Sequence, residues 1–387
     1  MRIALCLEYP IALRGGVSVL VEALLEEFVR RGHQVVLVSA DTAETLRASP
    51  AGKLVAEHFA WNRLKPSAAA AKKLARQLAG ARVDLAHFHS GGNYGWGNRF
   101  PFRSPIFFLN RLGVPCLATV HSVVGILEGY CGPQKPGWFK ALMWPLAWCG
   151  KMQQLRHTRR EIAVSQHDLK KLQSWYRPLQ NRFARIYHSR LRDEPVPREN
   201  TRREPVILNV GHLAWRKGQR VLAEAFAQIA ARHPEWILQL AGQDLDGETE
   251  KQILQLARQH RLEGRIQLLG ERTDAFALMR RAAIYVQPSF EEALGLALQE
   301  AMFYGCACAG SRVGGIPELI QENNTGLLFD PGNVGQLAQA LEQLIQNTDL
   351  REIFSHAAAA SIRERGMTVE QMAKSHLELY AKTTTRS

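Results

Sequence analysis

Residues 287–318 read QPSFEEALGLALQEAMFYGCACAGSRVGGIPE, and this stretch decides the fold. A strand-like run, Ala283–Val286, leads into it, and Glu292 is then expected to open a helix whose first turn carries Gly295. Glu300 follows eight residues later on the same expected helix. A helix N-terminus with a small residue attracts anions, and a carboxylate further along accepts hydrogen bonds from sugar hydroxyls. The stretch therefore predicts an anion site beside a hydroxyl-binding carboxylate, which is what a nucleotide sugar requires.

The alternative for this stretch is an amphipathic helix that is capped by a polar turn and holds its carboxylates in solvent. Two flanking elements weigh against that alternative, namely Pro288-Ser289 before the helix and Gly314-Gly315-Ile316-Pro317-Glu318 after it. With these elements the stretch resembles the retaining glycosyltransferases of family four, which have a GT-B fold. The resemblance covers nearly the whole chain and is strongest from Gly211 onward. It implies an α/β chain with two Rossmann-like, doubly wound domains that face each other across a cleft.

The length and the pattern of the chain agree with two domains. A chain of 387 residues with 46% hydrophobic content is too long for one ordinary core. Strand and helix patterns alternate throughout, which is typical of parallel sheets. We expect an acceptor-side domain over residues 1–195 and a nucleotide-sugar-binding domain over residues 196–365, joined by a linker within residues 193–204. The resemblance implies that a terminal helix, in residues 366–387, crosses back to the first domain.

Composition indicates a cytoplasmic protein. No uninterrupted apolar stretch reaches about eighteen residues, so no transmembrane helix is expected. Glu8 interrupts the N-terminal apolar run, which therefore predicts a first strand rather than the core of a signal peptide. The six cysteines are scattered, and Cys6, Cys116, Cys306 and Cys308 lie in apolar, strand-like runs, so buried free thiols in a reducing compartment are expected. Cys306-x-Cys308 has no partner pair at zinc spacing, so no metal site is expected.

The net charge of +13 is concentrated in the first half of the chain. Residues 135–194 hold 13 Lys and Arg against 4 Asp and Glu, and residues 61–82 hold six basic residues and no acidic one. A basic face indicates an anionic partner, such as membrane phospholipid, a phosphorylated glycan or nucleic acid, and a solubilising surface is the alternative. Residues 125–155 add aromatic and aliphatic bulk, which fits either a peripheral membrane element or a core helix pair. Pro145 disfavours a single helix there.

Two places in the first half are candidates for ligand contact. Gly15 and Gly16 precede the helical pattern of residues 17–31, where they either let the backbone approach a ligand or make a tight connection. The turn lacks G-x-G-x-x-G, so a standard dinucleotide site is not predicted. His121 ends the strand pattern of residues 115–122, and a satisfied strand-end histidine is the alternative there. The resemblance implies that both glycines face the cleft and that His121 lies beneath the donor sugar.

The second half contains a basic loop. Residues 211–218, Gly-His-Leu-Ala-Trp-Arg-Lys-Gly, resemble the family's Gly-Arg-Leu…Lys-Gly loop, whose Arg and Lys hold the diphosphate. Lys217 is in frame, whereas His212 replaces the arginine, and Arg216 is the candidate for the missing cation because a guanidinium suits a diphosphate better than a neutral imidazole. A basic surface turn is the alternative. A second departure is His188-Ser189, where the family usually has Asn-Gly.

The resemblance implies transfer of a sugar, with retained anomeric configuration, from a nucleotide diphosphate, and it implies neither a metal ion nor a cofactor. Glu300 would accept the ribose hydroxyls, Glu292 would hold the donor-sugar hydroxyls, and Arg272 follows a strand near which the family reads the base. The catalytic residues in this assignment are His121, Glu292 and Lys217. The donor-binding residues are Gly15, Gly16, His212, Arg216, Lys217, Arg272, Ala293, Leu294, Gly295, Leu296 and Glu300.

The expected partners are a nucleotide sugar, taken as UDP-linked, and a cell-envelope glycan or glycolipid acceptor such as lipopolysaccharide. Peripheral contact with anionic lipid at the inner face of the cell membrane is a further expectation, and nucleic acid is not expected. Two alternatives remain. The departures at His212 and His188 are compatible with a non-catalytic GT-B scaffold. The basic first half is compatible with a nucleic-acid-binding protein, although it contains no recognised module of that kind.

Overall fold

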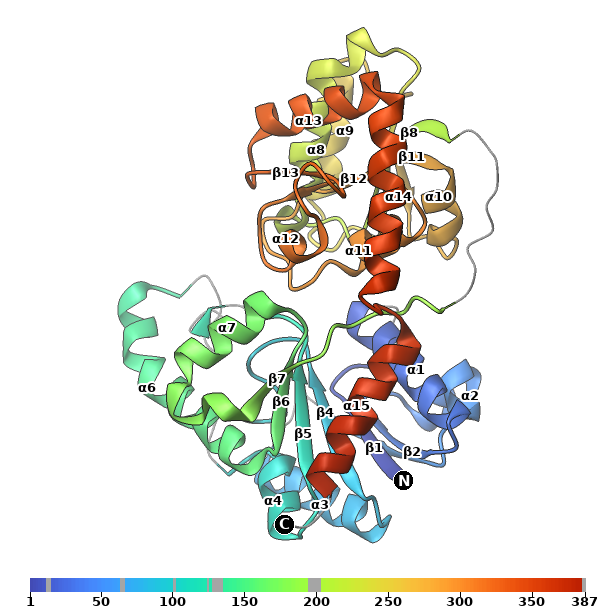
Figure 1. Ribbon diagram of the computed structural model, residues 1–387. Helices are drawn as coiled ribbons and strands as arrows, with labels where there is room; N and C mark the ends of the chain where they lie inside the picture. Colours follow the sequence, from blue (N-terminus) through green and yellow to red (C-terminus); the bar gives the residue numbers. More distant parts are fainter. Residues whose placement is uncertain are drawn as a thin grey trace. The chain divides into compact units, whose positions relative to one another are not determined.

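A computed structural model describes residues 1–11, 15–62, 67–99, 102–123, 125–126, 135–193 and 203–384. The chain divides into two compact units, one made of Met1–Arg192 with Thr368–Ser387 and the other of Asp193–Met367. Each unit holds one parallel sheet with flanking helices (Figure 1), so the α/β prediction is confirmed. Most of the expected linker, residues 193–204, lies outside the described residues.

The first unit is built on a seven-stranded sheet in the order β3-β2-β1-β4-β5-β6-β7. Its strands are β1 (Arg2–Leu7), β2 (Gln34–Ser39), β3 (Glu57–Ala60), β4 (Leu85–Ser90), β5 (Cys116–Val120), β6 (Arg160–Ala163) and β7 (Phe183–Arg185). Its helices are α1 (Gly16–Arg30), α2 (Ala43–Ala48), α3 (Ala68–Gly80), α4 (Pro105–Arg111), α6 (Gly137–His157), α7 (Gln166–Trp175) and α15 (Val369–Thr384), with 3-10 turns η1 (Pro50–Lys53) and η2 (Arg177–Arg182). The strand order reverses between β1 and β4, and ligands bind at such a switch point in open α/β sheets.

Local sequence explains where several of these elements begin and end. Ser67 caps α3 because its hydroxyl accepts a hydrogen bond from the Ala70 N–H. Gly32 follows α1 at a φ of +79°, a left-handed conformation that stops the helix at low cost. Every residue of β4 and of β5 is buried, as expected for strands covered on both faces.

The helix α6 corrects one prediction. It is a single helix that continues through Pro145, so the expectation that this proline disfavours a single helix is wrong. Pro145 is exposed, and water can satisfy the carbonyl group that a proline leaves unpaired, which lowers the cost of keeping it inside the helix. The core alternative holds only for the C-terminal half of α6, where Ala147, Met152 and Leu155 are buried.

The two faces of the first sheet bury different kinds of side chain. One face packs apolar residues such as Cys6, Val38 and Phe88 against α3 and α4. On the other face α15 lies beside α1 (Figure 1), and the Tyr380 hydroxyl lies 2.6 Å from Nδ1 of His87 on β4. The terminal helix is thus joined to the first sheet by a buried polar contact.

The second unit is built on a six-stranded sheet in the order β10-β9-β8-β11-β12-β13. Its strands are β8 (Glu204–Val210), β9 (Ile237–Ala241), β10 (Ile266–Gly270), β11 (Ala282–Gln287), β12 (Ala307–Ser311) and β13 (Leu327–Phe329). Its helices are α8 (Gln219–Ile229), α9 (Thr249–Gln259), α10 (Ala275–Arg281), α11 (Leu296–Phe303), α12 (Ile316–Leu319), α13 (Val334–Gln346) and α14 (Thr348–Glu364), with 3-10 turns η3 (Trp215–Lys217) and η4 (Ala230–Arg232). Here the switch point lies between β8 and β11.

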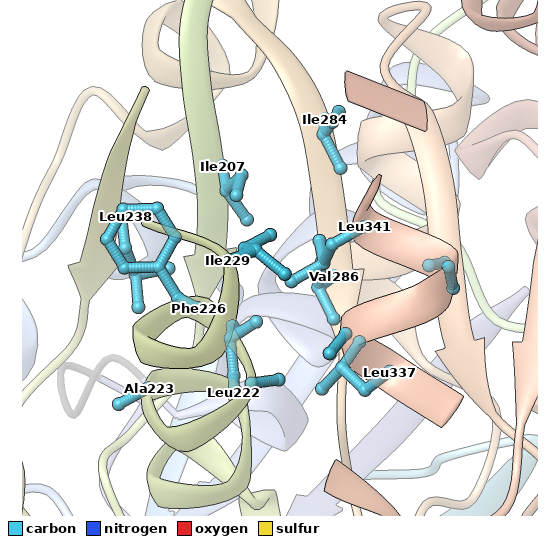
Figure 2. Packing of buried hydrophobic residues seen from close by; sticks show 14 of the residues in the cluster. Ile207, Leu222, Ala223, Phe226, Ile229, Leu238, Ile284, Val286, Leu337 and Leu341 are labelled. Atoms are coloured by element: carbon cyan, nitrogen blue, oxygen red, sulfur yellow. The ribbon is translucent and has the colours of Figure 1, made fainter. Parts of the chain in front are cut away.

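The core of the second unit fixes the two strands at this switch point. Helices α8 and α13 cover one face of the sheet, and their apolar side chains meet those of β8, β9 and β11 (Figure 2). The contacting residues labelled there are Ile207, Leu222, Ala223, Phe226, Ile229, Leu238, Ile284, Val286, Leu337 and Leu341. Close packing leaves β8 and β11 little freedom, so the loops that follow them start from fixed positions.

Candidate active site

The loop after β8 is held in place by hydrogen bonds along its length. Nε2 of Gln219 donates to the carbonyl oxygen of His212 at 2.9 Å. The backbone N–H of Trp215 donates to Oδ2 of Asp246 at 3.1 Å, and the Arg216 carbonyl oxygen accepts from the Phe290 N–H at 2.8 Å. The last of these contacts joins the loop after β8 to the loop after β11, so the two sides of the switch point form one surface.

Lys217 and Glu292 meet at the centre of this surface. The ammonium nitrogen of Lys217 lies 2.7 Å from Oε2 of Glu292, and both side chains are largely buried. Nε2 of Gln287 and Oγ of Ser289 donate to the same oxygen, each at 3.2 Å. The Tyr285 hydroxyl in turn donates to Oε1 of Gln287 at 2.8 Å. Lys217, Gln287 and Ser289 all contact Oε2 of Glu292, so its Oε1 can accept a hydrogen bond from a ligand hydroxyl.

The start of α11 corrects the sequence prediction. Glu292 does not open the helix, because α11 begins at Leu296 and Gly295 is its N-cap residue with a φ of +96°. A left-handed N-cap breaks the helical path, so Ala293 and Leu294 lie in the preceding turn with Glu292. Glu300 lies on α11 as predicted and is buried. The two carboxylates therefore do not share a helix, and Glu292 is placed by the turn instead.

Two glycines let other segments approach this turn. Gly218 has a φ of +69°, and a Cβ atom there would lie 1.9 Å from the Pro288 carbonyl oxygen. Gly314 has a φ of +55°, and its Cβ atom would lie 1.6 Å from the Glu292 carbonyl oxygen. Both distances are far inside van der Waals contact, so neither position accepts a side chain without moving the turn that carries Glu292.

Replacing Gly314 with Ala is expected to lower the free energy of unfolding of the second unit by about 2–4 kcal/mol, because the change adds both a clash and a left-handed Ala. The rate of any sugar transfer should fall as well, because relieving the clash would displace Glu292. Urea unfolding would measure the change in stability. Gly264→Ala is the matched control, because its Cβ atom meets nothing within 4 Å, and it should shift stability by no more than about 0.5 kcal/mol. Equal stabilities of the two variants would contradict the assigned packing.

The cations of the site differ in character. Burial, and then the charge of Lys217, lowers the pKa of His212, so this imidazole is neutral near pH 7 and does not replace an arginine as a permanent cation. Arg216 is exposed beside Lys217 and is always charged. Arg272 lies after the edge strand β10 and is paired with Asp274 through contacts of 2.8 and 2.7 Å. A ligand would have to displace Asp274 to take both of the guanidinium nitrogens that these contacts occupy.

The remaining predicted residues belong to the first unit. Gly15 is the N-cap residue of α1 and Gly16 is its first residue, and a Cβ atom at either position would meet nothing within 4 Å. Nothing in the described packing therefore requires glycine there. His121 follows β5, and its Nε2 lies 3.1 Å from Nδ1 of His89. The ring centroids of His121 and His188 also lie 4.8 Å apart. His188, which stands where the family usually has Asn, is therefore a neighbour of His121.

His121 is the half-buried member of a cluster of otherwise buried histidines on the first unit. The cluster consists of His87, His89, His121, His188 and His376. Burial lowers the pKa of every member, and neighbouring histidines lower that of four of them further. Within the described ranges no group of His, Cys, Asp or Glu side chains is arranged to hold a metal ion. The cluster is therefore a set of neutral rings packed under α15.

Sequence reasoning missed the residues that support Glu292. Tyr285, Gln287 and Ser289 alternate along the end of β11, and a period of two places such residues on one face of an extended segment. That pattern was the available signal, because a Tyr and a Gln at alternate positions are unusual in an otherwise apolar buried strand. His376 gave no such signal, since its partners are distant in the sequence.

Comparisons with known proteins assign both halves of the chain. Residues 192–361 match the family described as glycosyl transferases group 1, and residues 14–189 match the family described as glycosyltransferase family 4. N-acetyl-alpha-D-glucosaminyl L-malate synthase of Bacillus anthracis is 33% identical over 42% of this chain and 42% of its own length. Alpha-D-kanosaminyltransferase of Streptomyces kanamyceticus is 25% identical over 74% of each chain. The match to the Bacillus anthracis enzyme therefore spans less than half of that relative's length.

Solved structures show the same fold over the full length. A glycosyltransferase from Rickettsia africae has a TM-score of 0.77 at 20% identity and covers 100% of this chain and 99% of its own. Anabaena HepE in complex with UDP has a TM-score of 0.75 at 17% identity, over 99% and 100% of the two chains. WaaG, described as a glycosyltransferase involved in lipopolysaccharide biosynthesis, has a TM-score of 0.72 at 17% identity, over 99% and 100%. The adjoining family matches together take in nearly the whole chain, so both halves of this protein are similar to GT-B glycosyltransferases of family 4.

Proposed function

We propose that this protein is a retaining glycosyltransferase that moves a sugar from a UDP-linked donor to a cell-envelope glycan or glycolipid. The observation that carries the proposal is the contact between Lys217 and Glu292 at the switch point of the second sheet, with Arg216 beside it. A cation aimed at a phosphate position and a carboxylate aimed at sugar hydroxyls are the two groups that a donor of this class requires.

Sugar transfer from such a donor requires the site to stabilise a leaving diphosphate and an electron-poor anomeric carbon. Lys217, Arg216 and the N-terminal N–H groups of α11 would offset the charge that develops on the diphosphate. A bound phosphate would compete with Glu292 for Lys217, which frees the Glu292 carboxylate for hydroxyls of the donor sugar. Glu300 would accept the ribose hydroxyls from its buried position on α11.

Retention without a protein nucleophile is part of the proposal. We propose front-face transfer, in which the acceptor oxygen bonds to the anomeric carbon as its bond to the diphosphate breaks. The leaving phosphate oxygen takes the acceptor's proton, and the proposal assigns no role to a metal ion or a cofactor. In this assignment His121 holds a sugar hydroxyl, and its lowered pKa keeps the ring neutral and able to act as donor or acceptor.

Solved structures with the same fold support the donor and acceptor classes. A UDP-linked donor is supported by the UDP complex of Anabaena HepE, and an envelope acceptor by the described role of WaaG in lipopolysaccharide biosynthesis. The basic first unit suits an anionic acceptor at the inner face of the cell membrane. In this proposal the second unit binds the donor and the first unit binds the acceptor.

Thermal unfolding with a panel of nucleotide sugars would test the proposal. A donor present at about 100 times its Kd should raise the Tm by roughly 5 °C, because binding to the native state stabilises it by mass action. UDP-linked sugars should shift the Tm and ADP-, GDP- and CMP-linked sugars should not. Nuclear magnetic resonance of the product would then give the anomeric configuration. An inverted product would overturn the retaining assignment, and the lack of a shift with every nucleotide sugar would favour a non-catalytic scaffold.

A further inference from the structure

The N-terminal half of α6 leaves large apolar side chains uncovered. Trp138 is 70% exposed, Leu142 66%, Leu146 49% and Trp144 45%. Trp138, Leu142 and Leu146 are spaced four residues apart, so they line one face of the helix, whereas Trp144 lies on the opposite side and stacks on Trp148. We call Trp138, Leu142 and Leu146 the α6 apolar face. A contiguous exposed face of this kind marks an interaction site rather than ordinary surface.

The rest of α6 anchors this face to the first unit. The ammonium nitrogen of Lys151 lies 2.7 Å from Oε1 of Glu161 on β6 and donates to the carbonyl oxygen of Asn93 at 3.1 Å. Trp148 donates its indole N–H to the carbonyl oxygen of Trp175 at 3.2 Å. The buried C-terminal half thus holds the helix in place while its N-terminal half stands at the outer margin of the first unit (Figure 1).

The charge around the α6 apolar face has one sign. The helix carries no carboxylate along its whole length, and Lys135 and Lys140 flank its exposed end. Within residues 135–192 the only carboxylates are Glu161 and Asp168, and both are buried. The surface that this segment contributes is therefore apolar and basic.

We propose that the α6 apolar face docks the protein on an anionic phospholipid bilayer. Tryptophan and leucine insert at the boundary between headgroups and acyl chains, and lysines beside them attract anionic headgroups. None of the described helices has the length and apolar composition needed to cross a bilayer, so α6 would lie on the surface. The inference deepens the proposed function, on which it rests for a membrane-bound acceptor, by naming the element that brings the enzyme to its substrate.

A second copy of the chain fits this face less well. A two-fold dimer through α6 would bring two basic helices together, and neither helix has a carboxylate that could offset the positive charge of the other. An anionic bilayer meets the same basic helix with opposite charge. Charge complementarity therefore favours the bilayer.

Vesicle sedimentation with the full chain tests the proposal. Equimolar phosphatidylcholine and phosphatidylglycerol vesicles should bind the protein at least about tenfold more tightly than phosphatidylcholine alone. The variant Trp138→Ser/Leu142→Ser should lose at least about tenfold in affinity for the mixed vesicles. Lys135→Gln should lose about fivefold, and only at low salt. Because Trp138 and Leu142 are exposed, their replacement should leave the Tm unchanged.

Ile353→Ser is the matched control, because Ile353 is a similarly exposed apolar residue on α14 of the second unit and should leave vesicle binding unchanged. Equal binding by the wild type and by Trp138→Ser/Leu142→Ser would overturn the proposal. A dimer in light scattering that this variant abolishes, without vesicle binding, would overturn it in favour of a second copy. Displacement of the protein from vesicles by RNA through the same residues would overturn it in favour of nucleic acid. Since sedimentation needs no sugar nucleotide, its failure leaves the proposed transfer standing, and failure of donor binding leaves the docking standing.

Discussion

Replacing Lys217 with Met is expected to lower sugar transfer by about a hundred- to a thousandfold, the usual effect of removing one group that stabilises developing charge. The ammonium group of Lys217 is the largely buried cation of the candidate site, and it lies 2.7 Å from Oε2 of Glu292. Its removal takes away the countercharge for the diphosphate and leaves Glu292 with the neutral donors Gln287 and Ser289. Initial rates of transfer and the Tm shift with UDP would measure the two consequences.

Two further variants separate the roles within this pair. Glu292→Gln keeps Lys217 and removes a competing charge, so binding of UDP should be retained or tightened while transfer falls by about a hundredfold or more. Arg220→Ala is the matched control, because Arg220 is an exposed cation three residues from Lys217 that pairs with Glu224 on α8. It should leave both measurements unchanged. Full activity of Lys217→Met would refute the site, and equal losses in all three variants would point to misfolding.

The sequence was sufficient for the parts of this site that are local. Lys217 follows β8 and Glu292 follows β11, and a doubly wound sheet brings the loops after those strands to one edge. The same reasoning failed at the start of α11, because the helical pattern of residues 292–300 continues through Gly295 without a break. Two features keep residues 292–295 out of the helix, namely the left-handed conformation of Gly295 and the close approach of Gly314 to Glu292. The second of these is a tertiary contact.

The histidine cluster shows the opposite case. His87 and His89 lie on β4 and His121 follows β5, but His376 comes from a helix more than two hundred residues later. No periodicity in the sequence joins these positions, because their contact depends on strand register and on where α15 returns. The resemblance predicted a role for His121 alone, and the four rings packed around it became visible only in three dimensions.

The histidine cluster should make the first unit unstable in mild acid. An unfolded histidine has a pKa of about 6.5, whereas burial lowers the pKa of all five in the native unit, to about 4 for His376. Above the unfolded value neither state is protonated and stability is complete. As the pH falls below that value the unfolded state binds protons first, so stability is lost until the pH reaches the native pKa values.

Each of these histidines removes about 1.4 kcal/mol of stability per pH unit in this window, and five together remove up to about 7 kcal/mol per unit. Since a domain is stable by about 5–15 kcal/mol, the first unit should unfold within one to two pH units below about 6.5. Urea unfolding at a series of pH values would give the slope. His376→Phe should reduce the slope of stability against pH by the contribution of one proton, about 1.4 kcal/mol per pH unit, because one titrating ring is removed. Leu78→Ala, a core change on α3 without a titratable group, should lower stability at every pH and leave the slope unchanged. Equal stability of the wild type at pH values on either side of this window would refute a neutral, buried cluster.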